Sequence, residues 1–176
     1  MAITPDTKNW TWVLDRPCPE CGFDAAATEF QDVPGLLRSS ADDWRSILAG
    51  PAAAQRPDED TWSALEYAAH VRDLCRVYRM RLHLMLEDDD AAFADWDQDA
   101  TAVAERYAEQ EPAVVAEELT AEAERTAAAF AAVGPSQLDR RGLRSDGSAF
   151  TVDSLARYFL HDALHHLWDV RPQGTA

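Results

Sequence analysis

The chain has 176 residues, of which 47% are hydrophobic and 27% charged, as is ordinary for a single globular domain with its own core. A formal net charge of -16 argues against nucleic acid and anionic membrane surfaces as partners, because both require a positive patch. No apolar run approaches the roughly 18 residues of a membrane span, and the N-terminus lacks a signal-peptide pattern. Three cysteines, an odd number, do not make a disulfide framework. We therefore expect a cytoplasmic protein with reduced thiols.

Residues 1–23 are predicted to form an irregular N-terminal segment ahead of one domain at 24–172. This segment contains the motif CPECG, in which Cys18 and Cys21 are separated by two residues. A structural zinc site needs four ligands, usually two such pairs, and the other cysteine is Cys75. We interpret the motif as a tight turn with reduced thiols. A redox pair, or a second metal site shared across a dimer, is the alternative.

Apolar residues at helical spacing predict four long helices, at about 33–49, 64–87, 112–133 and 151–170. Asp32 is expected to cap the first helix. Ser63 and Glu66 form the capping-box pattern at the start of the second helix. Four amphipathic helices with little strand predict an all-α four-helix bundle.

The connections between these helices are less regular. The acidic stretch Glu87–Asp99 is interpreted as a solvated loop, because it lacks the glycine and glutamate spacing of a calcium loop. A short helix is expected near 102–109. Residues 135–150 contain Asp146-Gly147, a strong hairpin-turn signal. They predict a small two-stranded ribbon or an ordered loop before the last helix.

The last helix carries three of the five histidines. His161 and His165 are four residues apart, so their imidazoles share one face of the helix. Imidazole is a common ligand of divalent metals, and bundles place metals between facing helices. His70, on the second helix, is the candidate third ligand. From the residues alone, a metal site and a set of hydrogen-bonded core histidines both remain open.

The same helix offers two other interpretations. Asp162 and His166 have the same spacing as the first histidine pair, but His166 is expected to point toward the side of Phe159, as a structural residue or one that supports a ligand. HDALH also resembles the zinc-protease motif HExxH, although aspartate is shorter than the glutamate base of that motif.

Two motifs together resemble a known family. WSALEYAAHVRD (Trp62–Asp73) is similar to the tryptophan-led first-histidine motif of the DinB/YfiT-like superfamily. HDALHH (His161–His166) resembles the HxxxH motif on that family's fourth helix, and RSDGSAFTVDSL before it resembles the entry into that helix. CPECG is not part of this pattern. The resemblance implies a four-helix bundle, often a homodimer, in which three histidines hold one divalent metal, most often zinc or nickel.

On this sequence the implied metal ligands are His70, His161 and His165. Three protein ligands leave a coordination position open, as in catalytic sites. That position would hold either a thiolate or a water of lowered pKa. Asp73 and Asp169 are candidates to accept the second N–H of the metal-bound histidines.

The resemblance also implies an activity on a small-molecule substrate. Characterised members of the family use the metal with a low-molecular-weight thiol, such as mycothiol or bacillithiol, in S-transfer or isomerisation. We therefore expect a mycothiol-type thiol S-transferase or isomerase acting on a small electrophile. Arg141 and Arg144 are candidates to bind an anionic substrate group. A metal-dependent hydrolase and a non-catalytic metal-binding, ligand-binding or structural bundle are the alternatives.

Overall fold

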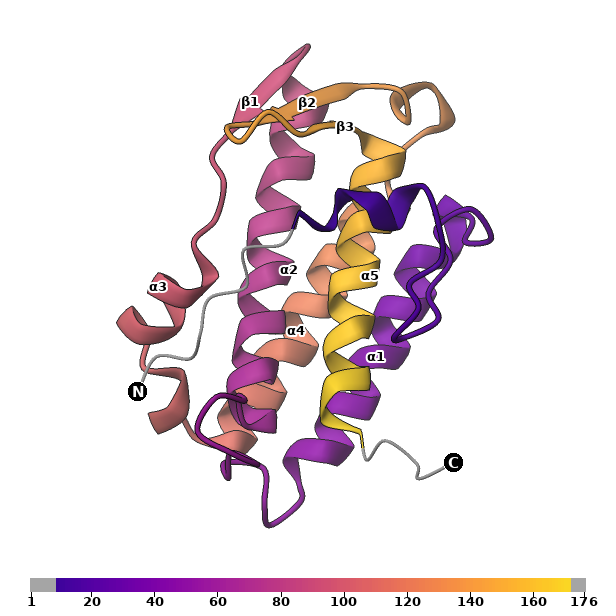
Figure 1. Cartoon of the computed structure of the whole chain (residues 1–176). Helices are drawn as coiled ribbons and strands as arrows, with labels where there is room; N and C mark the ends of the chain where they lie inside the picture. The colour runs from indigo at the N-terminus through magenta and orange to yellow at the C-terminus, as the bar shows by residue number, and fades with distance from the viewer. Residues whose placement is uncertain (1–8, 172–176) are drawn as a thin grey trace.

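Four long helices form a bundle in this computed structural model, which describes residues 9–171. The helices are α1 (Val33–Leu48), α2 (Ala64–Glu87), α4 (Pro112–Ala131) and α5 (Val152–Val170). α4 packs against α1 and α2, and α5 packs against the same two helices from the other side (Figure 1). α1 and α2 therefore lie on a diagonal, and the expected four-helix bundle is confirmed.

The core lies along the axis of the bundle, where all four helices contribute aromatic rings. Phe130 of α4 stacks on Phe159 of α5 with 5.7 Å between ring centroids. Tyr78 of α2 lies 5.2 Å from Phe159, and Trp44 of α1 is fully buried. These contacts hold α2 and α5 side by side, which matters for the site below.

The capping predicted from the sequence is present at the start of α2 but not at the start of α1. The Ser63 hydroxyl accepts the Glu66 backbone N–H, and the Glu66 carboxylate accepts the Ser63 N–H, so the capping box is confirmed. Asp32 makes no side-chain capping bond. The expected cap at Asp32 is wrong, because its backbone is already helical (φ -85°, ψ -21°) where a capping residue is extended. A 3-10 turn, Phe30–Asp32, leads directly into α1.

A small sheet closes one end of the bundle. Its strands are β1 (Ala91–Phe93), β2 (Arg141–Arg144) and β3 (Ala149–Thr151), with β2 in the middle, parallel to β1 and antiparallel to β3. The expected hairpin turn is present, with Gly147 at φ +92°, where glycine is favoured. The solvated-loop interpretation is wrong for β1, whose first and last residues are buried. Three residues are too short a stretch for alternation to be recognised.

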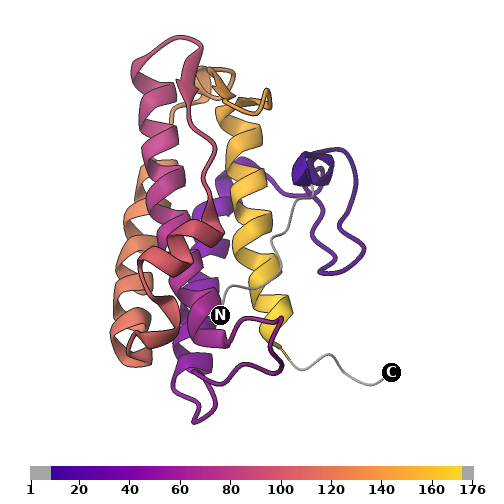
Figure 2. The ribbon, with the colours of Figure 1, turned by 60° about the vertical axis from the view of Figure 1, so that its left-hand side comes forward.

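The connection after β1 runs along α2 (Figure 2). It contains α3 (Gln98–Ala104) and a 3-10 turn at Tyr107–Glu109 in place of the single helix expected near 102–109. α3 starts earlier because the Asp97 carboxylate accepts the Ala100 N–H and caps it.

Ahead of α1, residues 9–29 form what we call the N-terminal segment. It opens with a 3-10 turn, Trp10–Leu14, that packs on α5, and continues as a loop beside that helix (Figure 2). This agrees with the irregular lead-in predicted from the sequence. Residues 1–8 of that lead-in lie outside the described residues, and so does residue 172, the last residue of the predicted domain. No helix in the described part of the chain combines the length and apolarity needed to cross a membrane.

The sheet approaches α2 so closely that one position requires glycine. A Cβ atom on Gly142 of β2 would lie 2.6 Å from Phe93 Cε1 and 2.8 Å from Met85 Sδ. We expect Gly142→Ala to lower the free energy of unfolding by about 2 kcal/mol through overpacking, as measured by urea unfolding. The matched control is Gly35→Ala in α1, where a Cβ meets no atom within 4 Å. It should instead raise stability by roughly 0.5 kcal/mol, and equal stability of the two variants would contradict this packing.

Candidate metal centre

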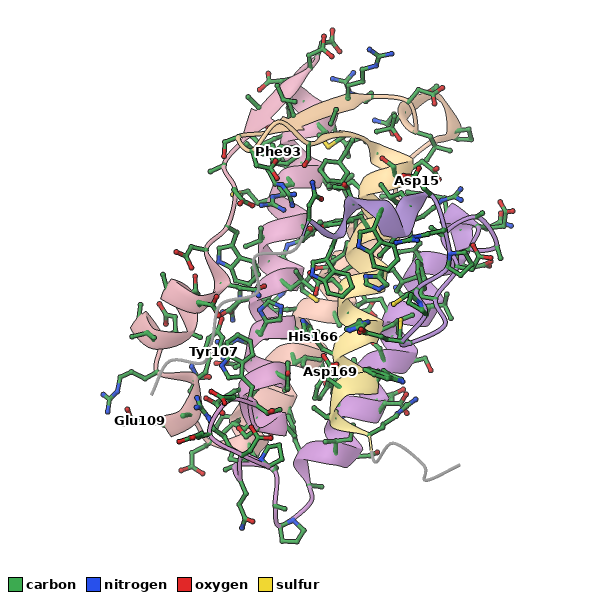
Figure 3. The ribbon with its side chains drawn as sticks, in the orientation of Figure 1. Asp15, Phe93, Tyr107, Glu109, His166 and Asp169 are labelled. Carbon is green, nitrogen blue, oxygen red and sulfur yellow. The ribbon has the colours of Figure 1, made fainter. Side chains whose placement is uncertain are left out.

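α5 presents two neighbouring stripes of metal-ligating side chains. His161 and His165 form one stripe, and Asp162 and His166 form the other. Successive residues of an α-helix are rotated by about 100°, so the two stripes face different neighbours. Figure 3 shows His166 on the side of α5 that faces α2.

The second stripe meets His70 of α2. Asp162 Oδ1 lies 3.0 Å from His166 Nε2 and 3.8 Å from His70 Nε2, and one ligand atom from each of the three residues lies within 4.8 Å of the others. The fully buried His70 ring stacks on Trp96 with 5.1 Å between centroids. Neither nitrogen of His70 has a hydrogen-bond partner among residues 9–171. Burying polar atoms without partners costs free energy, and a cation between the three residues would satisfy Nε2.

The charges in this cluster are arranged around the carboxylates of Asp162 and Asp169. Burial lowers the pKa of His70, which favours the neutral ring that a metal requires. Burial alone would raise the pKa of Asp162, but the contact with His166 and the nearby ring of His70 hold it far below its usual range. His166 Nδ1 lies 2.9 Å from Asp169 Oδ2. Burial opposes the charged ring of His166, yet Asp162 and Asp169 raise its pKa to about 9.

The first stripe meets the N-terminal segment instead. One ligand atom from each of Cys18, Cys21, His161 and His165 lies within 4.8 Å of the others. The Cys18 Sγ lies 3.7 Å from His165 Nδ1, and His161 Nε2 is buried without a hydrogen-bond partner among the described residues. Burial lowers the pKa of His161 to about 4, so its ring is neutral at pH 7. The cysteines are free thiols in the expected tight turn.

The set predicted from the sequence, His70, His161 and His165, is thus divided between two clusters. His166 does lie on the Phe159 side of α5, as expected, but that side faces α2 and therefore His70. In this structure His166 contacts Asp162 and Asp169, and its interpretation as a structural or supporting residue stays a prediction. A single site built from the three predicted histidines stays a prediction, and in this structure His161 and His165 contact the cysteines.

The two predicted supporting carboxylates behave differently. Asp169 contacts His166, as described above, and also lies 3.6 Å from His165 Nε2. Asp73 is engaged elsewhere: it accepts hydrogen bonds from Arg72, Arg76 and the Tyr107 hydroxyl. Asp73 therefore does not contact His70 as expected. Instead it holds the connection that contains Tyr107 against α2.

A cavity of about 770 Å³ lies beside both clusters, between α2, α5, the N-terminal segment and the connection that contains α3. Its aromatic lining is Trp10, Trp62, Tyr67, Tyr78, Trp96 and Tyr158. Its wall also carries the carboxylates of Glu20, Asp95, Asp97, Asp99 and Asp146, besides those of Asp162 and Asp169 on α5. Both clusters contribute side chains to this wall, so a small molecule in the cavity would lie against them.

Two arginines line the same cavity. Arg144, a candidate from the sequence, is paired through two hydrogen bonds with Asp146 and packs on Tyr158. Arg81 is 2% exposed, its Nη2 donates to the Ala94 carbonyl oxygen, and its Nε has no hydrogen-bond partner within residues 9–171. Arg81 is thus the better placed of the two to bind an anionic group.

Sequence reasoning missed Arg81, because it lies within the apolar stripe of α2 with no motif to mark it. The spacing of Asp162 and His166 did carry a signal for the cluster at His70, since it equals that of the first histidine pair. The cysteine pair carried a signal too, but its two histidine partners lie about 140 residues further along the chain.

Fold and site together define a four-helix bundle that holds histidine and carboxylate side chains between two facing helices. The chain belongs to the DinB superfamily, whose sequence model matches residues 51–170. YfiT from Bacillus subtilis, a solved structure described as a probable metal-dependent hydrolase with an unusual four-helix bundle topology, is similar with a TM-score of 0.70 and 16% identity. The match covers 80% of this chain and 85% of that chain, and it shows the shared fold. Among curated proteins, none matches the sequence significantly.

Proposed function

We propose that the protein is a divalent-metal-dependent enzyme and that His70, Asp162 and His166 hold its metal. The observation that carries the proposal is the buried Nε2 of His70, which has no hydrogen-bond partner in the described part of the chain and faces an ionised carboxylate and a second imidazole. Two imidazoles and one carboxylate form a donor set that suits zinc and nickel, the metals implied by the family resemblance. When bound, such a metal lowers the pKa of a thiol or water at its open position.

The neighbouring residues would hold these donors in place. Asp169 accepts the Nδ1–H of His166, which directs Nε2 toward Asp162. Trp96 stacks on the His70 ring, and Trp62 packs 5.7 Å from it. The ring orientations are therefore set by packing and hydrogen bonding before a metal arrives, as a precise site requires.

The lining of the cavity supports a hydroxyl-rich co-substrate. Carboxylates accept hydrogen bonds from hydroxyl groups, and the tryptophan rings offer apolar faces for the rest of the molecule. Arg81 would bind one negative group of the substrate pair. A sugar-containing thiol of the mycothiol type fits this lining better than a thiol rich in carboxylates. We therefore propose thiol S-transfer or thiol-assisted isomerisation of a small electrophile.

A hydrolase is the second candidate, favoured by the likeness to YfiT, which is described as a probable metal-dependent hydrolase. The same three residues would hold the metal in either reaction, so the site does not separate the two. They differ in whether turnover requires a thiol.

The test is turnover by metal-loaded protein on panels of electrophiles and esters, with and without a low-molecular-weight thiol. We expect thiol-dependent consumption of an electrophile that falls at least about 100-fold in His70→Ala, because loss of a ligand removes the metal. The matched control is His83→Ala, since His83 lies on the same helix but is exposed and pairs with Glu87.

Each result of this test has a definite meaning. Ester hydrolysis without thiol, lost in His70→Ala, would establish the hydrolase in place of the transferase. Metal-loaded protein that turns over neither panel, or turnover unchanged in His70→Ala, would refute the proposed enzyme. Metal-loaded protein that turns over neither panel would be a metal-binding module.

The partner in this proposal is a small molecule, without nucleic acid or membrane. A cytoplasmic location and a homodimer also stay proposals, the homodimer resting on the family resemblance alone. Sedimentation of the purified protein would measure its mass directly, and a monomer of 19.5 kDa would contradict the homodimer.

A further inference from the structure

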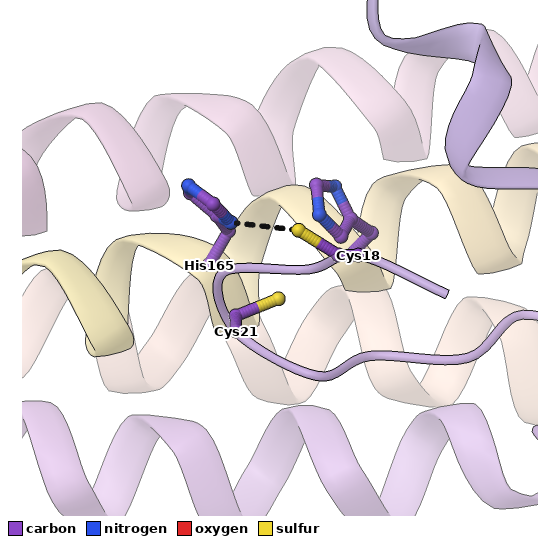
Figure 4. Close-up of side chains that lie close together, drawn as sticks. Cys18, Cys21 and His165 are labelled. Atoms are coloured by element: carbon purple, nitrogen blue, oxygen red, sulfur yellow. Dashed lines mark hydrogen bonds between the residues drawn. The ribbon is translucent and has the colours of Figure 1, made fainter. Parts of the chain in front are cut away.

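The CPECG turn presents two sulfur atoms to α5. The Cys18 N–H donates to the Phe23 carbonyl oxygen at 2.8 Å, and the Gly22 N–H donates to the Cys18 carbonyl oxygen at 3.0 Å. Gly22, at φ +75°, supplies the left-handed residue that reverses the chain. As a result, Cys18 and Cys21 lie side by side next to His165 (Figure 4). The turn is a short scaffold with both thiols on the side of the helix.

The four side chains have the geometry of a tetrahedral zinc site. Zinc binds sulfur at about 2.3 Å and imidazole nitrogen at about 2.1 Å, so a tetrahedral site separates sulfur and nitrogen by about 3.6 Å. The Cys18 Sγ and His165 Nδ1 are 3.7 Å apart, and all four ligand atoms lie within 4.8 Å of one another. His161 Nε2 is buried and has no hydrogen-bond partner in the part of the chain that the structure describes. Two thiolates and two imidazoles are one of the donor sets found in structural zinc sites such as zinc fingers.

The second ring nitrogen of His165, Nε2, lies beside carboxylates. His165 Nε2 lies 3.2 Å from Glu20 Oε2 and 3.6 Å from Asp169 Oδ1. Metal-bound histidines usually donate their second N–H to a carboxylate, which fixes the ring orientation. The carboxylates around Nε2 thus leave Nδ1 directed at Cys18, as a ligand nitrogen would be.

We infer that Cys18, Cys21, His161 and His165 form a structural zinc site that fastens the N-terminal segment to α5. Four protein ligands close the coordination shell, so this site has no open position for substrate. Both thiols lose their protons to solvent as the metal binds. The inference is independent of the proposed function, because none of its four ligands belongs to the cluster at His70.

The site would shape the cavity as well as stabilise the fold. Residues 15–29 form no helix or strand. Besides packing, the hydrogen bond from Arg157 Nη1 to the Ala25 carbonyl oxygen and the contacts of Cys18 and Glu20 with His165 hold them to α5. Trp10, whose ring lies 5.2 Å from that of His165, and Glu20 both line the cavity. Zinc would therefore hold one wall of the cavity in position.

Cobalt(II) substitution tests the inference on the whole protein, because cobalt bound to thiolates absorbs strongly through charge transfer. We expect the parent protein and His70→Ala to show this absorption, and Cys18→Ser/Cys21→Ser to lack it. The matched control is Cys75→Ala, which removes a buried thiol of the core and should leave the absorption unchanged. Elemental analysis of the zinc-loaded parent should give one more metal per chain than the double serine variant.

Thiol reactivity gives a second readout that does not depend on a variant folding. In the zinc-loaded parent, Cys18 and Cys21 should resist a thiol reagent, and a chelator should expose both to it. A parent protein without the cobalt–thiolate absorption, or with thiols equally reactive before and after chelation, would overturn the inference. A disulfide between Cys18 and Cys21 in freshly isolated protein would also overturn it, in favour of a redox pair.

Discussion

Replacing Asp169 with asparagine is expected to weaken metal binding at His70, Asp162 and His166 by about 10- to 100-fold when the two proteins are compared above pH 9, where His166 is deprotonated. Asp169 accepts the Nδ1–H of His166, and this contact directs Nε2 toward Asp162. Asparagine keeps the shape of the side chain but removes the negative charge that makes the imidazole a stronger donor. The loss should therefore appear in metal affinity, with little change in the secondary structure.

The measurement is competition with a chromophoric chelator, made in a Cys18→Ser/Cys21→Ser background so that only the cluster at His70 is observed. The control is Asp153→Asn on the same helix, since Asp153 pairs with Arg157 and does not line the cavity. Equal affinities of the two asparagine variants would show that Asp169 does not support the metal.

The same site should bind metal more tightly as pH rises. His166 must lose its proton before Nε2 can bind a metal, and its pKa of about 9 keeps it protonated at pH 7. Affinity should rise with pH until about 9 and then level off. In Asp169→Asn the pKa of His166 falls, because one of its two carboxylate partners loses its charge. The metal affinity of this variant should therefore stop rising at a lower pH. A pH-independent affinity would exclude His166 as a ligand.

Replacing Asp73 with alanine is expected to lower the free energy of unfolding by about 3 kcal/mol without affecting the metal site. Asp73 is 7% exposed and binds Arg72 and the Tyr107 hydroxyl, which are themselves buried. Removing one partner of a buried ion pair leaves the other charge without its partner in a medium that solvates it poorly. The control is Glu118→Ala, because Glu118 pairs with the same arginine but its side chain is 44% exposed. That change should cost only about 0.5 kcal/mol.

The pH dependence of stability gives an independent check on Asp73. Burial by itself raises the pKa of Asp73, but hydrogen bonds from Arg72 and Tyr107 outweigh it and lower the pKa below the ordinary value. The carboxylate therefore contributes stability above its unfolded pKa of about 3.9, and the contribution is lost as pH falls through the folded pKa. Urea unfolding from pH 7 to pH 3 should show a smaller loss of stability in Asp73→Ala than in the parent. Parallel curves, or metal loss in Asp73→Ala, would contradict this assignment.

Much of the fold follows from local patterns in the sequence. The helical spacing of apolar residues predicts the four long helices, and the capping box at Ser63 and the turn at Gly147 appear where their motifs stand. These features depend on residues a few positions apart, so the chain itself contains the information. The pairing of two motifs likewise identified the DinB superfamily, to which the chain belongs.

The grouping of the candidate ligands depended on the tertiary structure. From the sequence, the pairs on α5 are equivalent, because both have a spacing of four residues. Which pair meets His70 depends on the rotation of α5 about its axis, and packing of Phe159 against Tyr78 of α2 sets that rotation. The same rotation turns the other pair toward the N-terminal segment. Local periodicity could thus place histidines and cysteines on their elements, but only the packing of those elements decided which of them meet.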